Sequence, residues 1–375
     1  MSGIYVHIPF CHRKCHYCDF YSVANKSRQT NFHSYLINEI EAMASYLTDT
    51  VKTVYFGGGT PSVLATGQLK TILEAIQRTH PIANDAEITI EVNPEDMSQE
   101  YLAGIKELGF NRISIGVQSF NNSTLLFLGR KHSAQEAAAG VANARSAGFT
   151  NISVDLIYGI PNQSLEEWTD SINTAISLNP EHLSCYHLTI EPGTLFGLWE
   201  RKQRLKPIPD ENSQKYYDIL CHKLREAGYN HYEISNFAKK GFESKHNSSY
   251  WNNDSYLGIG PAAHSYNGNT RQWNVSNISK YISCIETKTP PFEVEELSEI
   301  DLYNEEIIKR LRTSEGINIA QFTSRFAEKW VEKLHHSIAP LVEQGAISLI
   351  DNRYFIPEDK LLVSDSIMVN LIENN

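Results

Sequence analysis

Six short segments rich in β-branched and aromatic residues alternate with helical segments along the first half of the chain. Two of the helical segments open with capping-box sequences, at Ser133–Glu136 and at Ser164–Glu167. Alternation of this kind is typical of parallel βα units, whose right-handed crossovers curl a sheet around one core. The predicted strands are 4–8, 51–56, 87–92, 112–117, 152–158 and 182–188.

The number of units favours one α/β fold over another. Six units are fewer than the eight of a complete barrel. A doubly wound fold is the alternative, but no G-x-G-x-x-G sequence opens a helix in this chain. We therefore expect an α/β fold built as a partial (β/α)6 barrel, in which functional side chains gather at the carboxyl ends of the strands.

The second half of the chain has a different pattern. Beyond Pro192 a polar stretch rich in Asn, Gly, Ser and Tyr leads to Pro290-Pro291. Helical segments and a hairpin that turns at Asp351-Asn352 follow, which predicts a smaller helical, winged-helix-like domain. The expected division is a partial barrel over 1–192, a connecting region over 193–290 and the C-terminal domain over 291–375.

Three of the six cysteines, Cys11, Cys15 and Cys18, lie in one loop directly after the first predicted strand. Thiolates this close in sequence suit an iron–sulfur cluster or zinc. With three thiolates, a four-iron cluster keeps one iron open to another ligand, whereas a structural zinc site has four protein ligands. His12 or His16 could complete a zinc site, so the residues alone leave both alternatives open.

The sequence around the cysteines resembles the radical S-adenosylmethionine (SAM) superfamily. Tyr-Val-His-Ile-Pro-Phe precedes Cys11 and Asp-Phe-Tyr follows Cys18, as in the branch that includes oxygen-independent coproporphyrinogen III oxidase and the heme chaperone HemW. The resemblance implies a [4Fe-4S] cluster whose open iron binds the amino and carboxylate groups of SAM. In the oxidase a further cysteine stands at the position of Phe20, so this chain follows the chaperone pattern.

Polar residues follow several predicted strands and predict a ligand site at one end of the barrel. A glycine-rich loop follows the second strand, and Glu91, Gln118 and Asp155 lie near the ends of later strands. Each could instead be a hydrogen-bonded structural residue. Arg130 could neutralise a carboxylate through a bidentate pair. The resemblance implies that SAM is bound at Tyr5, Tyr17, Gly58, Gly59, Thr60, Glu91, Gln118, Arg130 and Asp155.

A second motif, His246-Asn247-Ser-Ser-Tyr250-Trp251, lies in the polar stretch. Histidine is a common heme ligand, and an aromatic ring can cover a porphyrin face. A surface turn with one buried tryptophan is the alternative interpretation. We expect the motif to lie outside the barrel, and the resemblance implies that it binds heme, with His264 as a second candidate.

Charge and cysteine usage restrict the function. The formal net charge of −11 disfavours nucleic-acid partners. The chain has no apolar run of membrane-spanning length and no basic-then-apolar leader, and we expect reduced cysteines in the cytoplasm. We expect Cys185, Cys221 and Cys284 to be buried structural thiols.

The resemblance implies a heme chaperone that binds a cluster, SAM and heme. Its partners would be apo-hemoproteins such as respiratory enzymes, met at the inner membrane face, and it could act as a homodimer. The alternative is an enzyme, either a coproporphyrinogen III oxidase or another radical SAM enzyme. The sequence assigns no catalytic residue and leaves open whether SAM is cleaved.

Overall fold

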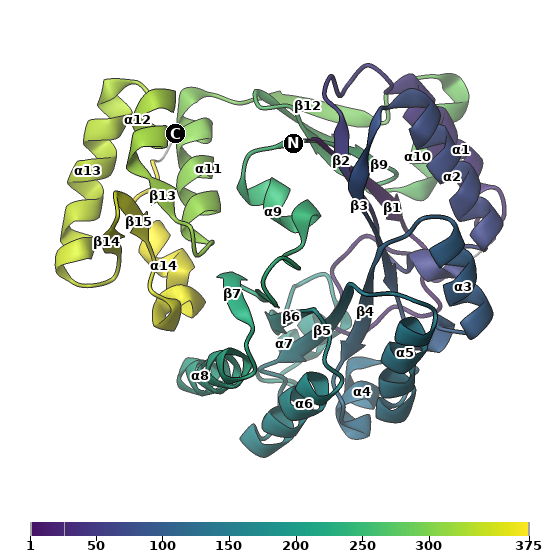
Figure 1. The fold of residues 1–375 in the computed structure, drawn as a ribbon, viewed down its shortest axis with the longest axis horizontal. Coiled ribbons are helices and arrows are strands. Elements are labelled where there is room, and N and C mark those ends of the chain that lie inside the picture. The colour runs from purple at the N-terminus through teal and green to yellow at the C-terminus, as the bar shows by residue number, and fades with distance from the viewer. Residues whose placement is uncertain (1, 26, 374–375) are drawn as a thin grey trace.

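A computed structural model describes residues 2–25 and 27–373, and so leaves out the outermost residues of the first and last expected domains. Its centre is a curved sheet in which six parallel strands, β1 to β6, stand side by side in chain order (Figure 1). Most of their apolar side chains are buried. The strands are β1 (Ser2–Ile8), β2 (Val51–Gly58), β3 (Ile82–Val92), β4 (Arg112–Gln118), β5 (Ile152–Tyr158) and β6 (His182–His187).

Helices cover the outer side of these strands, which confirms the prediction of a partial (β/α)6 barrel (Figure 1). The capping box at Ser133 is complete, whereas at Ser164 the carboxylate of Glu167 instead accepts a hydrogen bond from Thr124. Thr124 belongs to α4, a short helix that the sequence patterns did not predict. The helices are α1 (Phe32–Ala42), α2 (Thr66–Thr79), α3 (Gln99–Glu107), α4 (Asn122–Leu128), α5 (Ala134–Ser146) and α6 (Leu165–Ser177), with 3-10 turns η1 (Pro61–Val63) and η2 (Pro94–Asp96).

The segment that we expected to connect the two domains also extends the sheet. On one side β9 pairs in parallel with β1, and on the other side β8 pairs antiparallel with β6. The described sheet therefore has twelve strands in the order β12-β11-β10-β9-β1-β2-β3-β4-β5-β6-β8-β7. The added elements are α7 (Leu195–Arg201), α8 (Asp210–Glu226), β7 (Asn230–Glu233), β8 (Asn236–Ala238), α9 (Lys245–Trp251), β9 (Ser255–Ile259), β10 (His264–Tyr266), β11 (Thr270–Asn274), α10 (Ile278–Thr287) and β12 (Phe292–Glu296).

The C-terminal part packs helices beside a small sheet of order β13-β15-β14. The hairpin turns where predicted, because Asp351 and Asn352 both adopt positive φ angles, of 49° and 62°. This arrangement agrees with the predicted helical domain. Its elements are α11 (Glu299–Leu311), β13 (Ile317–Asn318), α12 (Ile319–Arg325), α13 (Glu328–Glu343), β14 (Ser348–Ile350), β15 (Arg353–Phe355), η3 (Glu358–Val363) and α14 (Ser364–Met368).

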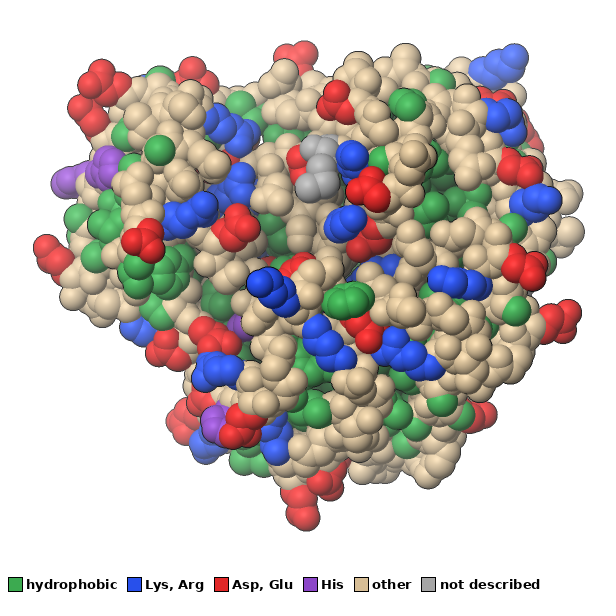
Figure 2. Space-filling model, in the orientation of Figure 1, with side chains coloured by type: hydrophobic (Ala, Val, Ile, Leu, Met, Phe, Trp, Pro, Cys, Tyr) green, Lys and Arg blue, Asp and Glu red, His purple; other side chains and the backbone are tan. Residues whose placement is uncertain are grey.

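The surface and the remaining cysteines can be compared with the sequence expectations. Acidic and basic side chains are interspersed over the face shown in Figure 2. No helix within residues 2–25 and 27–373 combines the length and the apolar character needed to span a bilayer. Cys185 and Cys221 are buried as expected, but Cys284 on α10 is partly exposed, so its predicted burial is wrong.

Candidate functional site

A cavity of about 360 Å³ lies at the carboxyl ends of the central strands, where the barrel architecture predicts a ligand site. This volume falls in the range of roughly 300–1,000 Å³ that is usual for small-molecule pockets. Tyr5 is not among its lining residues and lies deeper in the barrel, with its hydroxyl 3.2 Å from His7 Nδ1. The predicted residues that line the cavity are Cys11, Cys15, Tyr17, Cys18, Gly58, Gly59, Thr60, Glu91, Gln118, Arg130 and Asp155.

The spacing of the three loop cysteines favours a cluster over a single zinc ion. Within the described residues, the Sγ atoms of Cys11, Cys15 and Cys18 do not all lie within 4.8 Å of one another. Thiolates that share one tetrahedral zinc ion stand roughly 3.8 Å apart, given Zn–S bonds of about 2.3 Å. His12 Nε2 lies 2.7 Å from Asp96 Oδ1, and His16 Nδ1 donates to a backbone carbonyl at 2.9 Å. The loop therefore fits a multi-iron cluster with three protein thiolates.

Two donors point at the cysteine sulfurs. Thr60 Oγ1 lies 3.5 Å from Cys11 Sγ, and Arg130 Nη1 lies 3.5 Å from Cys15 Sγ. Burial raises the pKa of the Cys11 thiol and raises that of Cys18 to about 11. The guanidinium of Arg130 acts against this rise in the pKa of Cys11 and so favours the thiolate that metal binding requires.

Within residues 2–25 and 27–373 Arg130 makes no bidentate pair with a side-chain carboxylate, so such a pair with the carboxylate of a ligand stays a prediction. Its Nη2 donates instead to Asn93 Oδ1 and to the carbonyl oxygen of Gly116, both at 2.6 Å. The amide of Asn93 in turn donates to Thr60 Oγ1 at 3.2 Å. Arg130 and Asn93 thus connect three strand ends to the cysteine loop. Sequence reasoning missed Asn93, although it directly follows the third predicted strand.

The glycine loop after β2 is fixed by close packing. Gly58 has φ +104°, and a Cβ atom there would stand 2.4 Å from the His7 ring. A Cβ atom on Gly59 would stand 2.7 Å from the carbonyl oxygen of Ile8. A side chain at either position would disturb the fold as well as a ligand. Substitution of the loop is therefore a poor test of SAM binding, and the acidic residues offer a cleaner one.

Glu91 and Asp155 are partly buried carboxylates that both line the cavity. Tyr55 donates to Glu91 Oε1 at 2.8 Å, and burial raises the pKa of Glu91 to about 7. Ser114 donates to both oxygens of Asp155, at 3.1 and 3.2 Å, and burial raises the pKa of Asp155 as well. Such carboxylates can accept hydrogen bonds from the ammonium or hydroxyl groups of a ligand.

The backbone at the end of β4 is strained beside these carboxylates. Gln118 has φ +70°, and the pairing of β4 with β5 is irregular between Gly116 and Gln118. A non-glycine residue in the left-handed region costs of order 1–3 kcal/mol and is concentrated at functional sites. Gln118 lines the cavity, so the strained backbone lies at the candidate ligand site.

The pKa of Glu91 predicts the pH dependence of SAM binding. If Glu91 accepts a hydrogen bond from an N–H of the SAM amino group, its ionisation strengthens that bond, so the SAM affinity of the cluster-loaded protein should rise as the pH increases toward 7. The Glu91→Gln variant should bind SAM more weakly, and its affinity should no longer rise as the pH increases toward 7. Calorimetric titration across this range checks the prediction, and a parent affinity that stays constant below pH 7 would contradict it.

The raised pKa of Glu91 also determines the direction in which the stability of the fold changes with pH. The folded chain holds the Glu91 proton more tightly than the unfolded chain, whose carboxyl has the ordinary pKa of 4.5. Without ligand, the contribution of Glu91 to stability is therefore largest below pH 4.5 and is lost as the pH rises through about 7. Glu91→Gln should flatten this part of the stability profile.

The second predicted motif forms helix α9, and our expectation that it lies outside the barrel is wrong. His246 is 1% exposed and lies near the amino-terminal ends of β1 and β2, beside Gly3 and Thr53. Its Nδ1 is 2.8 Å from Thr53 Oγ1, and its Nε2 is 2.8 Å from the Tyr250 hydroxyl. The imidazole also stacks on the Tyr55 ring at 4.9 Å. Helix α9 thus lies at the end of the barrel opposite the cavity.

The other members of the motif are partly accessible. Asn247, Tyr250 and Trp251 are only partly buried, and the indole nitrogen of Trp251 is buried without a described partner. His264 on β10 is exposed. Sequence reasoning could not identify the packing of His246, because Tyr5 and Tyr55, the aromatic rings around it, come from distant parts of the chain.

Comparisons with known proteins identify families that share this architecture. The family model of the radical SAM superfamily matches residues 5–175, and that of the HemN C-terminal domain matches residues 297–359. The solved structure of coproporphyrinogen III oxidase (HemN) from Escherichia coli aligns with a TM-score of 0.82 over 99% of this chain and 89% of that chain. At 24% identity this likeness shows the fold alone.

Two sequence relatives extend the match. The heme chaperone HemW of Bacillus subtilis is 36% identical over 371 residues, which are 98% of this chain and 98% of that protein. The heme chaperone HemW of Escherichia coli is 42% identical over 70% of this chain and 69% of its own length. The chain therefore belongs to the HemW family of the radical SAM superfamily.

Proposed function

We propose that this protein is a heme chaperone that binds a [4Fe-4S] cluster, SAM and heme and delivers heme to apo-hemoproteins such as respiratory enzymes. The observation that carries the proposal is the end-to-end similarity to a protein named heme chaperone HemW. The cavity supports it, because three cysteines and two partly buried carboxylates line one volume there.

In this proposal Cys11, Cys15 and Cys18 hold the cluster, while Arg130 and Thr60 donate toward its sulfur ligands. When bound, the cluster would supply an iron with an open coordination position that can accept the amino and carboxylate groups of SAM as ligands. The protein's own part is to orient that ligand and keep it from water. The residues that we propose for SAM are Gly58, Gly59, Thr60, Glu91, Gln118 and Asp155, with Tyr17 beside the cysteines and Tyr5 behind the cavity.

Heme binding is proposed at helix α9, through His246, Asn247, Tyr250 and Trp251. The structure sets a condition for this role, because both ring nitrogens of His246 already have partners. An iron ligand must present a free lone pair, so α9 must turn out of its place before His246 can bind iron. Tyr250 and Trp251, which are partly exposed, could then cover a porphyrin face.

We further propose that the protein acts in the cytoplasm, peripherally at the inner membrane face, and as a homodimer. The three cluster cysteines support a reducing compartment. Respiratory enzymes would be met at the membrane, and the formal charge of −11 makes nucleic acid an unsuitable partner.

The second candidate is an oxygen-independent coproporphyrinogen III oxidase, which shares the fold. Phe20 argues against it. This side chain lines the cavity and is 68% exposed where the oxidase pattern has a further cysteine.

One anaerobic preparation can separate the two candidates. The cluster-loaded protein is charged with heme, mixed with an apo-form of a b-type cytochrome, and followed by the Soret band of the acceptor. The same preparation is then given coproporphyrinogen III, SAM and a reductant. We expect heme transfer to the acceptor without conversion of coproporphyrinogen. Conversion without transfer would overturn the chaperone proposal.

A further inference from the structure

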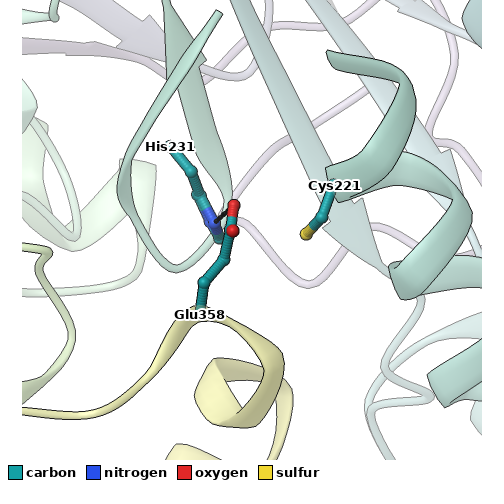
Figure 3. Close-up of side chains that lie close together, drawn as sticks. All are labelled: Cys221, His231 and Glu358. Atoms are coloured by element: carbon teal, nitrogen blue, oxygen red, sulfur yellow. Dashed lines mark hydrogen bonds and ion pairs between the residues drawn. The ribbon is translucent and has the colours of Figure 1, made fainter. Parts of the chain in front are cut away.

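Three side chains that do not line the cavity face one another where the C-terminal part meets the barrel edge (Figure 3). They are Cys221 on α8, His231 on β7 and Glu358 at the start of η3. One ligand atom from each lies within 4.8 Å of the other two. Within residues 2–25 and 27–373 no other group of three or more His, Cys, Asp or Glu side chains comes this close together.

The hydrogen bonds of His231 leave a lone pair facing the other ligands. Its Nε2 lies 3.3 Å from the carbonyl oxygen of Ile234, which can only accept, so Nε2 carries the hydrogen. Nδ1 then faces Glu358 Oε1 at 3.3 Å, and both atoms are acceptors unless a cation or a second proton lies between them. The imidazole is held in its plane by stacking on Phe237, with centroids 4.1 Å apart.

Neighbouring groups orient the other two ligands. Arg225 donates to Glu358 Oε2, which leaves Oε1 turned toward His231. The Tyr217 hydroxyl donates to the backbone oxygen of Glu358 at 3.1 Å and also contacts the Cys221 thiol. Hydrogen bonds of this kind around a metal site fix the direction of its ligands. The His231 side chain is 5% exposed and that of Glu358 is 32% exposed, so the group opens to solvent on the Glu358 side.

We propose that Cys221, His231 and Glu358 bind one Zn²⁺ ion, with water in the fourth position. Sulfur, imidazole nitrogen and carboxylate oxygen are the ligands that zinc takes in proteins. Bonds of about 2.0–2.3 Å place tetrahedral ligand atoms roughly 3.5 Å apart. His231 Nδ1 and Glu358 Oε1 already stand 3.3 Å apart, and the Cys221 sulfur lies within 4.8 Å of both ligands. The ion would join the C-terminal part to α8 and β7, and the site is independent of the proposed heme and SAM functions.

Binding includes a proton transfer that can be measured. A cysteine thiol, whose ordinary pKa is about 8.5, carries its proton at neutral pH. Zinc replaces that proton as the Zn–S bond forms, and the proton goes to the buffer. Each zinc bound should therefore release about one proton, which calorimetry detects when the titration is repeated in buffers of different ionisation enthalpy.

The test titrates Zn²⁺ alone into the full chain with the iron–sulfur cluster reconstituted, so that Cys11, Cys15 and Cys18 are occupied. We expect one zinc per chain by elemental analysis and a zinc-dependent rise in unfolding temperature. Cys221→Ser and Glu358→Gln should each weaken binding about 10-fold to 100-fold. Cys185→Ser, which changes another buried thiol, should bind zinc like the parent.

Two results would overturn the proposal. One is that the parent protein, with its iron–sulfur cluster in place, binds no zinc. The other is equal zinc affinity in Cys221→Ser and Cys185→Ser. If Cys221→Ser fails to fold, the zinc affinity of Glu358→Gln tests the proposal instead. The Glu358 side chain is partly exposed and glutamine has nearly the same shape, so this variant should fold.

Discussion

Replacing Cys11 with alanine is expected to abolish the cluster completely, with loss of the brown charge-transfer absorption at about 400 nm. Cys11 is the most buried of the three loop thiols and accepts from Thr60 Oγ1 at 3.5 Å. Two remaining thiolates cannot hold the four irons against water, so partial retention is not expected. Absorption spectra and iron content after anaerobic reconstitution measure the effect.

The matched control is Cys185→Ala. Cys185 is buried on β6 with 2% exposure and is not among the residues that line the cavity. This variant removes a thiol of similar burial and should keep the full spectrum. If Cys185→Ala lost the cluster while Cys11→Ala kept it, the assignment of the cysteine loop would be wrong.

The six central strands could be predicted because each is a compact run of apolar residues followed by a helix with regular periodicity. The added strands could not. β8 and β10 have three residues each, and Trp273 is the one apolar residue of β11, so none carries a strong pattern of its own. The sheet extends because the barrel edges at β1 and β6 offer unpaired backbone groups to β9 and β8, and further strands then add outside these two.

Some residues of the candidate site could likewise be predicted from the sequence, and others could not. Residues at strand ends, such as Glu91 and Asp155, could be predicted because parallel strands bring their carboxyl ends to one edge. Tyr55 could not be predicted, because its role depends on a hydrogen bond to Glu91 on the neighbouring strand. His246 was misplaced for a related reason. Its polar neighbours in sequence resemble a surface loop, while its packing partners come from β1 and β2.

His246→Ala is expected to weaken heme binding and shift the Soret band, because the proposed axial ligand is lost. The variant also leaves Thr53 Oγ1 and the Tyr250 hydroxyl without their buried partner. We expect a loss of stability of about 3 kcal/mol from the unpaired groups and the cavity. Heme titration with the cluster intact, together with thermal unfolding, separates the ligand effect from the structural one. A parent-like Soret spectrum and affinity would remove His246 as the ligand and leave His264 as the next candidate.

A second variant tests whether α9 must open before heme binds. Thr53→Val keeps the side-chain shape and removes one of the two hydrogen bonds that hold the His246 ring. Losing a bond worth about 1 kcal/mol lowers the cost of opening, so heme uptake should become roughly five times faster. Stopped-flow recording of the Soret band measures the rate. Thr89→Val is the matched control, because Thr89 is a fully buried strand threonine whose hydroxyl has no described partner. Equal uptake rates in the two variants would contradict gating by α9, since the His246–Thr53 hydrogen bond distinguishes them.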